Sequence, residues 1–221
     1  MKASKWVSSA LALTLAGSMA AGCSGSKTGD SPKPGAEGGN ASNAKQEIKI
    51  NLAAEPPALD SSKSTANAAF TMLNALNEGL YRIDKDGKVQ PGLAKAAPEV
   101  STDGLTYKIT LRDNLVWADG TPLKANDFVS AFKRTLDPAT KAQYSFMLAW
   151  IQGGAELNKA KPEEVQAKKD AVGVKALDDK TLEIKLSKPV GFFTSLLAFP
   201  IFFPQKRGHG QSSRREVRIG R

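Results

Sequence analysis

The first 46 residues limit where a packed core can begin. Lys2 and Lys5 precede an apolar stretch over residues 7–21, which ends in Ala-Ala-Gly before Cys23. The stretch is shorter than the roughly 20 apolar residues of a membrane-spanning helix. Its order of positive, apolar and small residues is typical of a secretory signal. Residues 24–44 are rich in Gly, Ser, Pro and Asn and nearly lack apolar side chains, so they cannot bury enough surface to fold. A folded body is therefore expected only from residue 47.

Cys23 is the only cysteine, and its position directly after Ala-Ala-Gly resembles the bacterial lipobox, in which the thiol is diacylated and becomes the new N-terminus. One departure is Ala20, where lipoboxes more often have Leu. The alternative is an uncleaved helix with a buried Cys23. Two acyl chains are what stable anchoring requires. We therefore expect a signal peptide over 1–22 and a lipidated, disordered tether over 23–46, which holds the exported protein on the extracytoplasmic side of a membrane.

Composition argues against several classes of function. The chain has one Cys and one His, His209, so thiolate or imidazole metal sites and His-dependent triads have almost no residues to use. The net charge of +9 is concentrated at the ends, because five of the eight Arg lie in residues 207–221. The body between has no basic patch of the kind that tracks phosphates, which argues against nucleic-acid binding. We expect no catalytic residue, no metal and no cofactor.

The body over 47–206 alternates between strand-like and helix-like patterns. Alternating apolar residues predict strands over 47–53, 80–83, 105–111, 174–177 and 181–186. The turn sequences at 84–87 and 178–179 predict two hairpins. Helical spacing predicts helices over 70–80 with a cap at Gly79, from Asn126 or Asp127 to 136, over 144–158 and over 162–171, with a short helix or turn at 191–197. The chain is therefore expected to be mixed α+β, with no internal repeat.

One segment of the body, residues 117–128, carries a conspicuous turn and helix start. The run from Trp117 to Pro122 predicts a tight turn in which Gly120 supplies unusual dihedrals. Trp117 is expected to be buried, and Phe128 to point inward from the following helix. The members of this structural motif are Trp117, Asp119, Gly120, Pro122, Asp127 and Phe128. Their expected role is in folding rather than in ligand contact.

The motif and several shorter segments, in register from about residue 48 to 204, are similar to the peptide-binding proteins of bacterial ABC importers, the extracellular solute-binding proteins of family 5. The supporting segments are Pro57-Ala58-Leu59-Asp60, Glu78-Gly79-Leu80, Pro91-Gly92-Leu93-Ala94, Arg134 with Asp137-Pro138, and residues 173–183. This resemblance implies a type II periplasmic-binding-protein clamshell. Residues 47–206 would supply part of the first lobe and an adjoining subdomain, and the second lobe would be missing.

The resemblance also implies a ligand, a site and partners. Family members close two lobes over an extended peptide, whose main chain is held as an added strand. The ligand-facing stretch would be Ser64, Thr65, Ala66 and Asn67, with helix capping by Ser64 or Thr65 as the alternative. Tyr144 matches an aromatic position facing the cleft, with core packing as its alternative. The implied partners are extracellular peptides and the permease and ATPase of an importer, and the implied protein is not an enzyme.

The resemblance ends near Lys206, and family members are more than twice this length. Residues 207–221 switch from Lys to Arg, which favours a shifted reading frame over a genuine basic tail for anionic lipid. The apolar run over 196–203 is expected to return toward the first lobe, whose sheet is completed in the family by later strands. Because this chain lacks those strands, we expect the apolar face that would meet them to be exposed, and the product to fold incompletely and not to bind peptide. Two other function classes stay open. One is a lipid-anchored hydrolase with a carboxylate pair, although most acidic residues lie at predicted turns. The other is a peptide-sensing surface module.

Overall fold

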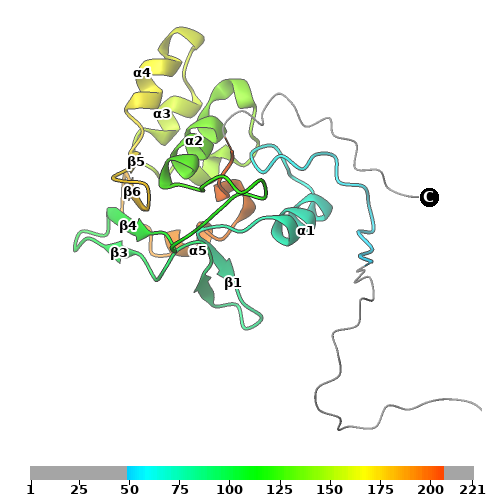
Figure 1. The fold of residues 1–221 in the computed structure, drawn as a ribbon. Helices are drawn as coiled ribbons and strands as arrows, with labels where there is room; N and C mark the ends of the chain where they lie inside the picture. Colours follow the sequence, from blue (N-terminus) through cyan, green and yellow to red (C-terminus); the bar gives the residue numbers. More distant parts are fainter. Residues whose placement is uncertain (1–48, 207–221) are drawn as a thin grey trace, which may run out of the picture. The chain divides into compact units, whose positions relative to one another are not determined.

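The computed structural model describes residues 49–206 (Figure 1). The predicted signal peptide, the tether with Cys23 and the tail over 207–221 lie outside the described residues. Along the chain the helices and strands are α1 (Asn67–Leu76), β1 (Tyr81–Ile83), β2 (Val89–Pro91), β3 (Glu99–Val100), β4 (Thr106–Thr110), α2 (Ala125–Leu136), η1 (Pro138–Thr140), η2 (Ser145–Leu148), α3 (Gly154–Asn158), η3 (Pro162–Glu164), α4 (Val165–Asp170), β5 (Val174–Ala176), β6 (Thr181–Lys185), α5 (Phe193–Leu196) and η4 (Pro200–Phe202). The predicted mixed α+β class is confirmed.

An antiparallel sheet of four strands, in the order β3-β4-β6-β5, lies at the centre of the body. Tyr107 of β4 pairs with Ile184 of β6, and Ile109 pairs with Leu182. All four of these side chains are buried, whereas their sequence neighbours Lys108 and Lys185 are exposed. This alternation is what one buried face of an antiparallel sheet requires. The predicted hairpin of β5 and β6 and the predicted strand at β4 are confirmed.

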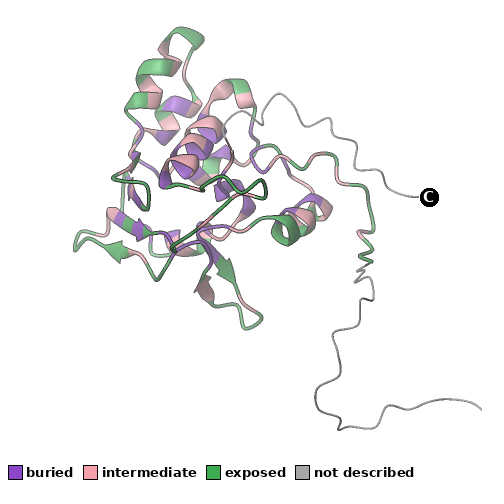
Figure 2. Ribbon diagram, in the orientation of Figure 1, coloured by how far each residue is buried: buried purple, intermediate pink, exposed green. Residues whose placement is uncertain are grey.

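Helix α2 covers the buried face of this sheet by packing on β5 and β6 (Figure 1). Its inward side chains include Phe128, Phe132 and Leu136, each fully buried. Figure 2 shows buried residues in purple and half-buried residues in pink along this helix. The helix ends at Leu136, and Asp137 follows as its C-cap, because the residue before a proline avoids the helical region. Its first turn differs from the prediction. Lys124 is the N-cap residue. Asp127 is the third residue of the helix, and its carboxylate accepts a hydrogen bond from the Lys124 amide.

In Figure 1 the β1–β2 hairpin lies below the central sheet and α1 lies to the right of it. The hairpin turns through Gly87, which has a φ of +76°, and the Asp84 carboxylate accepts bonds from the amides of Asp86 and Lys88. The predicted helix near residues 70–80 exists but ends earlier, at Leu76 with Asn77 as its C-cap. Gly79 therefore does not cap it. A Cβ at Gly79 would come within 2.6 Å of the Phe203 ring, so this glycine instead allows close packing.

Two further predicted elements were wrong. In the described part of residues 47–53 there is no strand. Ile50 is exposed there, and the Ala53 amide bonds locally to the Asn51 side chain, because no partner strand lies alongside. The predicted helix over 144–158 is broken into η2 and α3. Gly153 has a φ of +72°, and a Cβ there would meet the carbonyl oxygen of Ala171 at 2.9 Å, so the chain turns sharply at this point.

The structure also shows how far two apolar features, Trp117 and the run over 196–203, are buried. Trp117 is half-buried rather than buried. Ile201, Phe202 and Phe203 of the run over 196–203 are buried in the core formed by the described residues, with exposures of 1%, 0% and 3%. The run thus packs into the body formed by the described residues. Among residues 49–206, no helix combines the length and the apolar character needed to cross a membrane.

Candidate functional site

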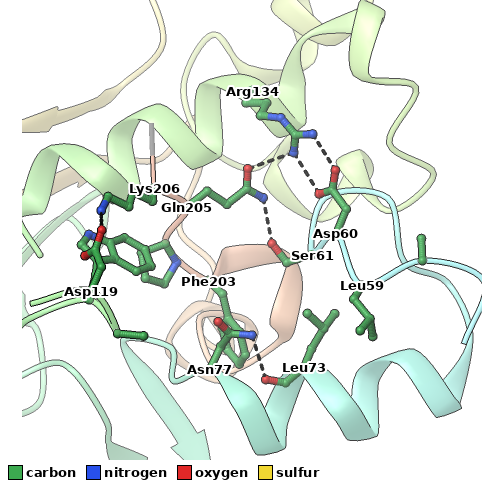
Figure 3. Close-up of a pocket in the computed structure, with 14 residues that line it drawn as sticks. Leu59, Asp60, Ser61, Leu73, Asn77, Asp119, Arg134, Phe203, Gln205 and Lys206 are labelled. Atoms are coloured by element: carbon green, nitrogen blue, oxygen red, sulfur yellow. Dashed lines mark hydrogen bonds and ion pairs between the residues drawn. The ribbon is translucent and has the colours of Figure 1, made fainter. Parts of the chain in front are cut away.

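A pocket of about 720 Å³ opens where four distant parts of the chain meet (Figure 3). Its walls come from α1 with the loop before it, from the Trp117–Asp119 turn, from α2, and from the segment after η4. Its apolar lining includes Leu59, Leu73, Trp117 and Phe203. Its polar lining includes Asp60, Ser61, Asn77, Asp119, Arg134, Gln205 and Lys206. The pocket therefore has an apolar wall and a rim of charged and amide groups.

Asp60 and Arg134 form a two-pronged ion pair at this rim. The Nη1 of Arg134 donates to Oδ1 of Asp60 at 2.9 Å, and its Nη2 donates to Oδ2 at 2.6 Å. Burial would raise the pKa of Asp60, but the hydrogen bond and the charge of Arg134 outweigh burial and hold this pKa below its ordinary value. Asp60 is therefore a carboxylate near neutral pH. The planar guanidinium suits this bidentate contact, which a lysine could not reproduce.

Gln205 extends the ion pair into a network. Its side-chain oxygen accepts from Nη1 of Arg134 at 2.9 Å. Its amide nitrogen lies 2.8 Å from Oγ of Ser61 and 2.7 Å from Oγ of Ser62. The Ser62 hydroxyl also lies 2.7 Å from that of Thr135 on α2. Side chains from three distant segments thus meet at one turn.

Two of the motif residues that were predicted to be structural, Trp117 and Asp119, also line the pocket. Asp119 is ion-paired with Lys206, and the hydrogen bond from Lys206, followed by those from Thr121, lowers the pKa of its carboxyl. The Trp117 indole donates to Oδ2 of Asp127 at 3.2 Å. Gly120 has a φ of +80° in the turn, as expected. Phe128 is fully buried, and Pro122 forms an isolated bridge with Val116.

The four residues of the predicted ligand-facing stretch over 64–67 differ in how far they are exposed. The Ser64 side chain is buried, and its hydroxyl lies 2.8 Å from the carbonyl oxygens of both Ala58 and Asp60, so it closes the preceding turn. Thr65 and Ala66 are half-buried, and Asn67 is exposed as the first residue of α1. The alternative of helix capping by Ser64 or Thr65 is wrong, because the N-cap is Ala66 and makes no side-chain cap.

Tyr144 lies in an aromatic cluster that reaches this stretch. Phe70, one turn into α1, has its ring centroid 5.9 Å from that of Tyr144 and 4.9 Å from that of Phe199. Tyr144 also packs on Phe146 at 5.8 Å, and the Phe146 side chain is 60% exposed. We call Phe70, Tyr144, Phe146 and Phe199 the aromatic cluster. The helix that begins in the predicted stretch is therefore joined to Tyr144 through Phe70.

Sequence reasoning missed the Asp60–Arg134–Gln205 network. The first two residues were noted only as parts of separate family segments, and no local pattern pairs positions 74 apart in the chain. No metal-binding group of His, Cys, Asp and Glu side chains is found within residues 49–206. The two carboxylates of the pocket are both ion-paired.

A family model now decides the assignment. The model of the bacterial extracellular solute-binding proteins, family 5, middle region, matches residues 88–218, which is more than half of the chain. The chain belongs to this family. Members of family 5 are extracellular solute-binding proteins rather than enzymes, and the relatives MppA and YgiS of Escherichia coli are named as periplasmic.

Curated relatives of family 5 agree with this assignment. The oligopeptide-binding protein OppA of Bacillus subtilis is 37% identical over 168 residues, which are 76% of this chain and 30% of that protein. The B. subtilis dipeptide-binding protein DppE is 38% identical over 71% of this chain and 28% of its own length. A probable deoxycholate-binding protein of Escherichia coli, YgiS, is 40% identical over 72% of this chain and 29% of its own. The chain thus spans about 30% of the length of these relatives.

Solved structures show the same fold. OppA of Listeria monocytogenes bound to peptide matches with a TM-score of 0.63 and 39% identity, over 69% of this chain and 29% of that one. The unliganded murein tripeptide-binding protein MppA matches with a TM-score of 0.63 and 34% identity, over 72% of this chain and 30% of that one. The described residues therefore have the fold of one part of a type II peptide-binding protein, as predicted.

Proposed function

We propose that this chain is part of the substrate-binding component of a peptide ABC importer, and that the aromatic cluster contacts the peptide. The observation that carries the proposal is the contact of Phe70 with Tyr144, because it joins α1, which begins at Asn67, to a second predicted ligand-facing residue. Phe146 exposes 60% of its surface beside them. An exposed aromatic on a packed cluster is suited to receive an apolar side chain of an extended peptide.

The chemistry of the pocket supports capture rather than catalysis. Asp60 is paired with Arg134 and Asp119 with Lys206, and both carboxyl groups have a lowered pKa. A general acid needs a pKa near the working pH, so neither group suits a hydrolase with a carboxylate pair. We therefore propose a binding protein without catalytic activity.

The anchor and the partners belong to the same proposal. The Ala-Ala-Gly-Cys segment and the polar stretch after it support cleavage before Cys23, diacylation of its thiol and a tether to residue 46. The body would then work on the extracytoplasmic side of the membrane. Its partners would be extracellular peptides and the permease and ATPase of the importer.

Calorimetry on the full-length protein that carries residues 47–206 tests this function. The probes are the tripeptide Ala-Phe-Ala, trialanine and deoxycholate, the ligand in the name of the YgiS relative. We expect both peptides to bind, Ala-Phe-Ala more tightly than trialanine, and deoxycholate not to compete. Binding of deoxycholate with no peptide binding would refute the proposal.

A pair of variants tests whether the aromatic cluster is the contact. Phe146→Ala should weaken Ala-Phe-Ala binding about tenfold and leave trialanine nearly unchanged, because a lost aromatic contact costs on the order of 1 kcal/mol. Phe192→Ala is the matched control. Phe192 is 55% exposed and packs on Trp150 at 6.2 Å, outside the aromatic cluster. Equal effects of the two variants would exclude the cluster as the site.

A further inference from the structure

The turn over residues 60–64 determines how α1 begins. The carbonyl oxygen of Asp60 accepts from the amides of Lys63 and Ser64, both at 2.9 Å, and its carboxylate accepts from the Ser62 amide at 3.0 Å. Only Thr65 and Ala66 separate this turn from the first residue of α1. Because α1 has no side-chain cap of its own, the direction of its first turn depends on the turn before it.

Three side chains from elsewhere fix this turn. Arg134 holds the Asp60 carboxylate with two hydrogen bonds, and Thr135, its neighbour on α2, holds the buried Ser62 hydroxyl. Gln205 bonds to Arg134 and to the hydroxyl of Ser61 (Figure 3), and also to the hydroxyl of Ser62. The contacts hold three successive side chains of the turn, those of Asp60, Ser61 and Ser62, so together they restrict its orientation as well as its distance from α2.

This ion pair differs from the exposed pairs on the surface. The side chains of Asp60 and Arg134 are each 31% exposed, whereas those of Lys85 and Asp86 are 88% and 58% exposed. A bidentate pair with restricted solvent access is geometrically specific, while exposed pairs hold little structure. Gln205 further restricts the guanidinium by accepting from one of its two donating nitrogens.

The aromatic cluster depends on the same placement. Phe70 is on the first turn of α1, and its contacts with Tyr144 and Phe199 are edge-on, at interplanar angles of 66° and 61°. Edge-on pairs lose contact when one ring turns or shifts. A change in the starting direction of α1 would therefore separate Phe70 from Tyr144.

We infer that Asp60, Arg134 and Gln205 are positioning residues for peptide binding. None of them belongs to the aromatic cluster, and they act through the 60–64 turn by holding α1, and with it Phe70, against Tyr144. The inference rests on the proposed function, since the peptide is its ligand, but the geometry it concerns lies wholly within the described residues. A displaced contact group far from the ligand can cost on the order of tenfold or more in function.

The first experiment measures the order of the segment without any ligand. Hydrogen–deuterium exchange is compared between the full chain and its variants Asp60→Asn, Arg134→Lys and Gln205→Ala. We expect faster exchange of the amides from Ser62 to Phe70 and unchanged exchange in β4 and β6. Gln205→Ala is included because it leaves the Asp60–Arg134 ion pair intact, so faster exchange in this variant cannot be assigned to the loss of that pair. Unchanged exchange at the segment in all three variants would overturn the inference.

The second experiment measures the affinity of the full-length protein for Ala-Phe-Ala. Each variant should raise Kd by about tenfold, with Arg134→Lys no better than Asp60→Asn, because lysine keeps the charge but not the two-pronged geometry. The matched control is Lys169→Met, which removes the ion pair with Asp137, the C-cap of α2, where the side chains are 28% and 15% exposed. Its Kd should stay within twofold of the unchanged protein.

The outcomes separate this inference from the proposed function. If the unchanged protein does not bind Ala-Phe-Ala or trialanine, the function fails whatever the exchange data show, and the positioning role fails with it. If the unchanged protein binds and the variants loosen the segment without a change in Kd, only the positioning role is refuted. An equal loss of affinity in Lys169→Met would assign the effect to general stability and would also refute it.

Discussion

Trp117 and Asp127 are joined by a hydrogen bond in which the indole nitrogen lies 3.2 Å from Oδ2 of the carboxylate. The same oxygen accepts from the Lys124 amide at 3.0 Å, in the first turn of α2. One carboxylate oxygen therefore links the turn of the Trp117 motif to the start of the helix that covers the sheet. A negative charge is also favourable at this end of a helix.

Replacement of Asp127 by Ala should lower the free energy of unfolding by about 1–2 kcal/mol, because the helix loses its cap contact and the indole loses its acceptor. The measurement is urea denaturation. Asn126→Ala is the control, since sequence alone made Asn126 an equal candidate for the cap. Its effect should be much smaller, and an equal effect would contradict the assignment of the cap to Asp127.

Gly120 is needed for its backbone conformation rather than for its small size. Its φ is +80°, and a Cβ would meet no atom within 4 Å. Gly120→Ala should therefore cost about 1 kcal/mol from backbone strain, and Gly120→Asn less, because Asn tolerates this region better. Gly191 has equally open surroundings without a positive φ, so Gly191→Ala should cost nothing of this kind. Thermal unfolding of the three variants tests whether strain explains the difference.

Sequence predicted those elements whose signal is local. The alternation of Tyr107 and Ile109, the Asp-Gly turn of the β1–β2 hairpin and the apolar face of α2 are each visible within a few residues, and each is confirmed. The break at Gly153 was missed because the apolar residues keep a helical spacing on both sides of this glycine. Its cause is a close approach to Ala171, which no local pattern contains.

The candidate site was less predictable because its contacts join distant positions. Family resemblance pointed to Ser64 and Tyr144 separately, but only the structure shows Ser64 buried and Tyr144 joined to α1 through Phe70. The pairing of Asp60 with Arg134 and Gln205 depends on how α2 and the segment after η4 pack together. Side chains 71 to 74 residues apart carry no mutual signal in a single sequence.

The Asp60–Arg134 pair predicts a specific pH dependence of stability. The pKa of Asp60 is lower in the folded protein than its ordinary 3.8. A carboxyl with a lowered folded pKa stabilises above its unfolded pKa, and this contribution is lost as the pH falls through the folded value. The stability difference between the unchanged chain and Asp60→Asn should thus be constant from about pH 7 to pH 5 and shrink below about pH 4. A difference that grows at acid pH would contradict this reasoning.

Cleavage before Cys23 and diacylation of its thiol are predicted from the first 46 residues alone. Cells given a clickable fatty acid should label the unchanged chain, and Cys23→Ala should abolish the label, because no other cysteine can form the thioether. Cys23→Ser is the closest size-matched control and should also be unlabelled. Labelling that survives either substitution would show that the acyl chain is attached elsewhere or that the signal is of another type.

The final prediction concerns folding of the body on its own. Ile201 and Phe202, in the apolar run over 196–203, are 1% and 0% exposed and belong to the same core as Leu80, Phe132 and Phe193. Phe202 packs edge-on against Phe132 at 5.4 Å and against Phe193 at 6.3 Å, so it joins α2 to α5.

Residues 47–206, produced alone, should therefore be monomeric and unfold cooperatively in urea. A version ending at residue 199 lacks these side chains and should not fold. Within residues 47–206, Phe202→Ala should cost about 3–5 kcal/mol, the usual effect of removing a fully buried aromatic side chain. Noncooperative unfolding of residues 47–206 would show that the buried run does not complete a self-sufficient core.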